Sequence, residues 1–98
     1  MSGLSGLEPW LRPYAESLVS LLPGVRVTSV YRSYSAQLRL WLNRSRSPYP
    51  VAPPGRSMHQ RRRAFDISAP PDQLVWLGAT WRSWGGTWHE SDPIHFEA

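Results

Sequence analysis

The stretch AFDIS at residues 64–68 places one aspartate between two apolar residues. Successive side chains of a β-strand point to opposite faces, so Asp66 points away from the side taken by its apolar neighbours. Residues 94–97, IHFE, repeat the pattern with His95 in the polar place. If the two strands are antiparallel neighbours, opposed side chains begin ~5 Å apart at Cβ. We expect the apolar pairs to face one core, and Asp66 and His95 to share the other face within reach of one metal ion.

His59 is the third residue that this face can recruit. It lies seven residues before Asp66, a separation that spans up to ~24 Å in an extended chain, so the chain between them must double back as an arch. Glycine would make that bend easy, but this sequence has Arg62 there. Two imidazoles and one carboxylate with an open water position are the arrangement of a catalytic zinc. We therefore predict that His59, Asp66 and His95 bind Zn²⁺.

Asp92 is the candidate general base. It stands three residues before His95, so on one continuous strand the two would face opposite sides, and Asp92 must lie where the chain turns. Pro93 biases the residue before it away from helical conformation, and the residues around it are typical of turns. From a turn beside the metal, a carboxylate can take a proton from metal-bound water.

Three other polar residues near the carboxyl end have open roles. His89 is either a fourth ligand, which would close the site, or a residue of the cleft rim. Glu90 is an alternative base to Asp92, at a less suitable spacing from His95. Glu97 shares the face of His95 and either orients that histidine or is solvated near the terminus.

Composition limits the class of protein. A chain of 98 residues without cysteine predicts one domain, covering residues 1–98, with neither disulfides nor thiolate metal ligands. No apolar run reaches the ~18 residues of a membrane span, so we expect no membrane insertion. The amino terminus has no secretion signal, so we expect synthesis in the cytoplasm. All eleven basic residues are arginine and the net charge is +4, which favours polyanions in general.

The order of the predicted elements mixes helices with short strands and has no regular βαβ rhythm. This order predicts an α+β fold, a small antiparallel sheet with about three helices packed against it. A proline-rich loop is expected at residues 44–55, Ser35 is expected to cap the second helix, and the tryptophans at 76, 81, 84 and 88 are expected mainly in the core. The helices are predicted at residues 13–22, 35–43 and 70–81, and the strands at 25–30, 63–68 and 94–98.

Three segments together carry a family resemblance. They are SVYRSYSAQ at residues 29–37, SMHQRRRAFDIS at 57–68 and WGGTWHESDPIHFE at 84–97. In combination they resemble the zinc D,D-carboxypeptidases, a superfamily that includes the L-alanyl-D-glutamate peptidases of phage endolysins, the D-alanyl-D-alanine dipeptidases and the Hedgehog-like fold. The chain departs from the family by Arg62 where glycine is usual and by its short length.

The resemblance implies roles for the matching residues. The three predicted ligands bind zinc and Asp92 acts as general base. Arg32 matches an arginine that contacts the substrate near the scissile carbonyl, where it would stabilise the oxyanion. Ser57 matches a serine that lines the same site.

The implied function is a zinc metallopeptidase that cuts the peptide stem of peptidoglycan, of the D,D-carboxypeptidase or L-Ala–D-Glu endopeptidase type. We expect a monomer, a phage endolysin or its catalytic core, that acts on the cell wall after release. The alternative is a zinc-stabilised binding module of the same fold without turnover, as in the Hedgehog signalling domain. The arginines at 61–63 are a solvated arch or a patch for anionic wall polymers; a nucleic-acid partner is not expected, because such sites spread basic residues over a face.

Overall fold

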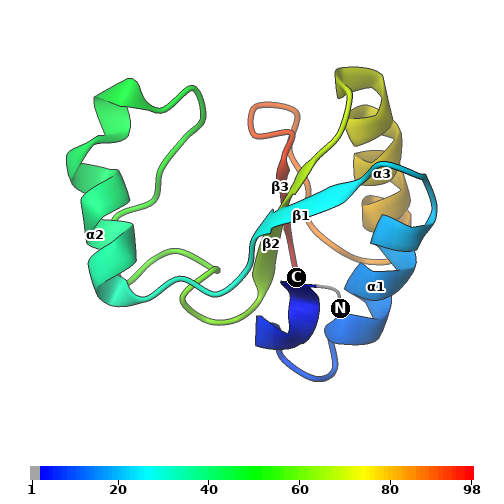
Figure 1. Cartoon of the computed structure of the whole chain (residues 1–98), viewed down its shortest axis with the longest axis horizontal. Coiled ribbons are helices and arrows are strands. Elements are labelled where there is room, and N and C mark those ends of the chain that lie inside the picture. The colour runs from blue at the N-terminus through cyan, green and yellow to red at the C-terminus, as the bar shows by residue number, and fades with distance from the viewer. Residues whose placement is uncertain (1–2) are drawn as a thin grey trace.

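A computed structural model describes residues 3–98 and contains three helices and one antiparallel sheet of three strands in the order β1-β2-β3 (Figure 1). The predicted α+β class is therefore confirmed. Two short 3-10 turns lie at Gly3–Gly6 and Arg44–Arg46. The strands are β1 (Arg26–Ser29), β2 (Ala64–Ser68) and β3 (His95–Glu97), and the helices are α1 (Arg12–Ser20), α2 (Tyr34–Leu42) and α3 (Pro71–Ser83).

The core lies between the sheet and the pair α1 and α3, which run beside each other on one of its sides (Figure 1). Phe65 and Ile67 of β2 and Phe96 of β3 are fully buried, as their alternation predicts. Phe65 stacks on Phe96 with ring centroids 5.5 Å apart and meets Trp81 of α3 edge to face at 5.2 Å. Such pairs add to the stability that burial of aromatic area provides, so β2 and β3 are fixed against the helical layer.

Two sequence predictions about helices and tryptophans need correction. Ser33, not Ser35, caps α2, because its hydroxyl accepts a hydrogen bond from the Ala36 amide at 3.2 Å. Trp76 and Trp84 are 49% and 40% exposed, whereas the tryptophans at 81 and 88 are buried. A single helical layer covers only one face of α3, so the residues of its other face remain in solvent.

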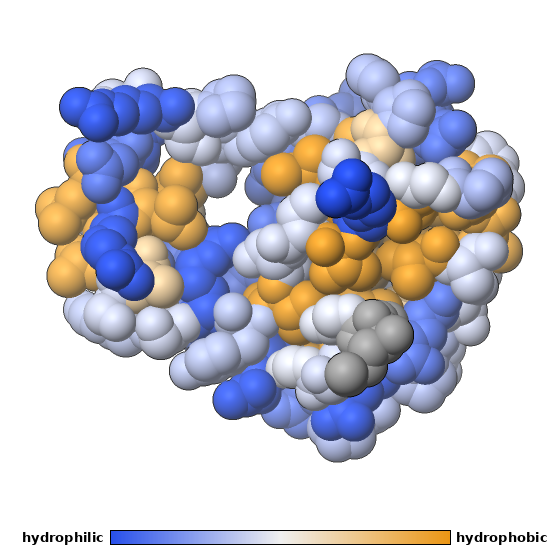
Figure 2. All heavy atoms as spheres, in the orientation of Figure 1, coloured by the Kyte–Doolittle hydropathy of each residue, from blue (hydrophilic) through white to orange (hydrophobic). Residues whose placement is uncertain are grey.

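Residues 34–56, comprising α2 and the loop after it, form a lobe that stands apart from the rest of the chain in Figure 1; we call it the α2 lobe. Gln37 is its one buried residue among those of the helix, and its Nε2 donates to the Ala52 carbonyl at 2.7 Å, which ties the helix to the loop. Tyr34, Leu38 and Leu42 follow helical spacing and are exposed, and Figure 2 shows apolar side chains gathered over this helix.

Among residues 3–98, no helix is both long and apolar enough to cross a membrane.

Candidate metal centre

The arch between His59 and β2 is a series of tight turns. The amides of residues 60 and 61 donate to the carbonyls of Ser57 and Met58, and the Arg63 amide also donates to the Met58 carbonyl, at 3.0 Å. Arg62 has φ +59, the only positive φ of a non-glycine residue among residues 3–98. The bend therefore requires the left-handed conformation that glycine adopts most easily, at the position where the sequence predicts a difficult bend.

Arg62 has contacts that offset this backbone cost. Its guanidinium lies over the ring of Tyr31 at 4.0 Å, and its Nη1 donates to the Gly6 carbonyl at 3.3 Å. The neighbouring Arg63 donates through Nε to the Ala98 carbonyl at 2.6 Å. Two of the three arginines in the run are therefore engaged with the protein itself, whereas Arg61 is exposed.

His59 is buried beneath this arch with a defined tautomer. It is 2% exposed, and its Nδ1 lies 2.6 Å from the Val30 carbonyl oxygen. A carbonyl can only accept, so Nδ1 carries the proton and Nε2 is left with its lone pair. That Nε2 faces Asp66 Oδ1 at 3.2 Å.

Asp66 and His95 are directly opposed partners in the β2–β3 ladder, as the alternation of their strands predicts. His95 Nδ1 lies 3.2 Å from the same Asp66 oxygen that faces His59. On its other side, His95 Nε2 is 2.7 Å from Glu97 Oε1. Both ring nitrogens face a carboxylate, and the contact of Nε2 is the shorter one, so in the neutral ring Nε2 carries the proton and Nδ1 presents a lone pair toward Asp66. Glu97, which the sequence leaves between two interpretations, therefore contacts and orients the imidazole.

The result is two imidazole lone pairs and a carboxylate oxygen aimed at one another, an arrangement that requires a positive charge between them. Burial raises the pKa of Asp66, but hydrogen bonds from His59 and His95 outweigh it and bring that pKa well below its ordinary value. Burial lowers the pKa of His95, but hydrogen bonds to Asp66 and Glu97 outweigh it and raise that pKa.

The separations of these atoms fit a divalent metal. One ligand atom from each of His59, Asp66 and His95 lies within 4.8 Å of the others, and no other such cluster occurs among residues 3–98. Zinc–nitrogen and zinc–oxygen bonds of ~2.0–2.1 Å in a tetrahedron place adjacent ligand atoms ~3.3 Å apart. The two shortest separations here are 3.2 Å. His89 is outside the cluster, so a tetrahedral ion held by these three residues would keep one position open.

Arg32 is held beside the cluster by three polar contacts. Its Nη1 donates to Gln37 Oε1 at 2.9 Å, and its Nη2 donates to Ser29 Oγ at 2.9 Å and to Asp66 Oδ2 at 3.4 Å. Gln37 is 1% exposed and joins this guanidinium to the α2 lobe. Sequence reasoning assigned no role to Gln37, although its inclusion in the 29–37 segment that carries the resemblance was a usable signal.

Ser57 is buried at the start of the arch. Its hydroxyl accepts a hydrogen bond from the His59 amide at 3.2 Å, which helps to fix the first turn of the arch. The serine therefore both borders the site and positions the backbone of a predicted ligand.

A cleft of about 670 Å³ lies between the α2 lobe and the polar face of the sheet. Asp92 lines it, half-buried, in a turn in which its amide donates to the His89 carbonyl at 3.1 Å. Burial raises the pKa of Asp92, against the attraction of nearby His95. Glu90 does not line this cleft but a neighbouring groove, which weighs against it as an alternative base. All six residues assigned from the sequence line the cleft: Arg32, Ser57, His59, Asp66, Asp92 and His95.

Neither a family model nor a curated protein matches the sequence. Solved structures do match. A variant of the vancomycin-resistance D,D-pentapeptidase VanY in complex with Zn(II) is 21% identical with a TM-score of 0.70, over 93% of this chain and 71% of that one. The chain shares the fold of this D,D-pentapeptidase.

Two further structures agree. The LD-carboxypeptidase LdcB, described for its peptidoglycan recognition, is 21% identical with a TM-score of 0.70, and DacB from Streptococcus pneumoniae is 20% identical with a TM-score of 0.66. The matches cover 94% and 95% of this chain but 65% and 66% of those chains. The chain therefore spans only about two thirds of the carboxypeptidases it resembles, and the predicted fold resemblance is confirmed.

Proposed function

We propose that the chain is a zinc-dependent peptidase that hydrolyses an amide bond in the peptide stem of bacterial peptidoglycan. The observation that carries the proposal is the convergence of two imidazole lone pairs and the Asp66 carboxylate on one point in a cleft. The Zn(II) bound to VanY and the peptidoglycan recognised by LdcB support the same metal and substrate class.

The ligand set is His59 Nε2, Asp66 Oδ1 and His95 Nδ1. Zinc held there would lower the pKa of a bound water toward ~7 and polarise the scissile carbonyl. The Val30 carbonyl and the Glu97 carboxylate contact the two imidazoles on the sides away from Asp66. These outer contacts orient both rings so that the other nitrogen of each faces the proposed metal position.

Asp92 and Arg32 have complementary tasks in this proposal. Asp92 accepts the proton of the attacking water and passes it to the leaving amine; the burial that raises its pKa brings its basicity closer to this task. Arg32, fixed by Ser29 and Gln37, places a positive charge where the carbonyl oxygen becomes negative. Ser57 borders the bound peptide.

The bond that is cut is of the D,D-carboxypeptidase or L-Ala–D-Glu endopeptidase type. The protein acts on the cell wall as a single-domain monomer. Its biological role is that of a phage endolysin or the catalytic core of one. The preparation to be tested is the full chain loaded with zinc.

The test is digestion of purified peptidoglycan with mass spectrometry of the released peptides. We expect the zinc-loaded chain to release stem peptides, Asp92→Asn to keep its zinc and release none, and Asp72→Asn, a change of an exposed acid on α3, to behave as the parent. A zinc-loaded parent that releases nothing supports the binding module instead. Undiminished release by Asp92→Asn rejects its role as base.

A further inference from the structure

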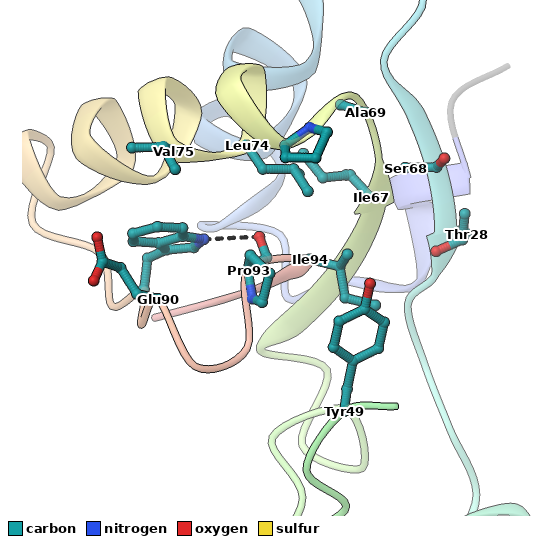
Figure 3. Close-up of a pocket in the computed structure, with 12 residues that line it drawn as sticks. Thr28, Tyr49, Ile67, Ser68, Ala69, Leu74, Val75, Glu90, Pro93 and Ile94 are labelled. Atoms are coloured by element: carbon teal, nitrogen blue, oxygen red, sulfur yellow. Dashed lines mark hydrogen bonds between the residues drawn. The ribbon is translucent and has the colours of Figure 1, made fainter. Parts of the chain in front are cut away.

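A second groove, of about 570 Å³, adjoins the metal cleft. In Figure 3, Leu74 and Val75 of α3 lie across from Pro93 and Ile94, with Glu90 near one end and Tyr49 near the other. Tyr49 and Ile94 line both the groove and the cleft. The two hollows therefore share a wall, and a peptide in one can extend into the other.

The groove begins one residue from the predicted ligands. Ile67 follows Asp66 on β2, and Ile94 precedes His95 at the start of β3. Tyr49 and Ile94 line both hollows, and an extended peptide advances by ~3.4 Å per residue. A side chain one or two residues from an amide bond at the metal is therefore within reach of the groove.

The chemistry of the groove is specific. Most of its lining is apolar, with hydroxyls of Thr28, Ser68 and Tyr49 among it. Glu90 is its one charged residue, in a chain whose net charge is +4 and whose arginines line no part of it. Among residues 3–98, Glu90 has neither an ion pair nor a side-chain hydrogen bond. Apolar walls suit a hydrocarbon chain, and an acidic end suits a cation at its tip.

We propose that this groove is a specificity subsite for an aliphatic side chain that ends in a primary ammonium, carried by a residue near the cleaved amide bond. Leu74, Val75 and Ile94 contact its methylene groups, and Glu90 pairs with the ammonium. The proposal rests on the proposed peptidase function, because it places the groove on the path of the substrate.

The test compares synthetic peptides that differ in one side chain: lysine, its uncharged isostere norleucine, or glutamate, placed in turn at the two positions on each side of the cleaved bond. The zinc-loaded chain should cleave the lysine peptide with a kcat/KM roughly two- to fivefold above norleucine at one position, the range of an exposed ion pair, and the difference should lie in KM. Glu90→Gln should remove the preference, and Glu90→Lys should transfer it to the glutamate peptide.

The matched control is Glu16→Gln, which removes an exposed carboxylate on α1 and should leave the preference intact. A lysine-to-norleucine ratio unchanged in Glu90→Gln overturns the proposal, as does loss of all turnover in that variant. If the parent cleaves no peptide, the proposed function fails, and calorimetric titration of the same peptides then tests the subsite alone. Equal affinities for the lysine and norleucine peptides would reject the subsite. A preference for lysine that Glu90→Gln abolishes would support it.

Discussion

Glu97 offers the most direct test of how the metal centre is built. The change is Glu97→Ala, which removes the acceptor 2.7 Å from His95 Nε2 and frees the imidazole to change tautomer or rotate. Removal of such an outer partner costs 10–100-fold in metal affinity, ~1.4–2.7 kcal/mol. The Glu97 side chain is 27% exposed, so water can replace part of the lost contact, and we expect a loss near ~10-fold.

The assay is zinc competition against a chromophoric chelator at neutral pH. Glu97→Gln keeps an oxygen that can accept the same hydrogen bond, so it should recover most of the affinity, while Glu16→Ala should match the parent. Equal zinc affinities for Glu97→Ala and the parent would refute the reasoning, since His95 would then need no partner to stay oriented.

Three other outcomes follow from the same structure. Gly78→Ala should lower the free energy of unfolding by ~1–2 kcal/mol in urea titration, because the new Cβ overlaps the Trp88 indole and this outweighs the gain in helix propensity; a more stable variant would contradict it. Chelation should lower the Tm of the zinc-loaded chain, because zinc stabilises only the folded state, and an unchanged Tm in a chain shown to have held zinc would count against the site. In the metal-free chain the lowered pKa of Asp66 contributes stability that is complete above pH ~4 and is lost as the pH falls further, so Asp66→Asn should flatten the acid side of a Tm–pH profile, and an unaltered slope would be the contrary result.

The sequence was most informative where local geometry decides the outcome. Alternation alone placed Asp66 and His95 on one face and Phe65 and Phe96 in the core, because the two-residue period of a strand needs no knowledge of the rest of the fold. The register, in which Asp66 faces His95, follows from the same pattern because a slip by one residue would turn the polar group of the shifted strand into the core.

Features that depend on distant segments were not predictable in this way. The clamp on Arg32 needs Gln37, which in turn needs a carbonyl of the loop at Ala52. The exposure of Trp76 depends on how many layers pack against α3, which periodicity does not state. The left-handed Arg62 was indicated only by the missing glycine, and its compensating ring, Tyr31, lies in the segment between β1 and α2.

Because Asp66 pairs with His95 across β2 and β3, metal binding at this site would require the correct register of the sheet. A β3 segment docked one residue out of place would turn its imidazole toward the hydrophobic side, and no cation would be retained. Only molecules in which β2 and β3 pair in the native register would gain the stability that zinc adds. The population that binds zinc would therefore be the population with a fully formed sheet.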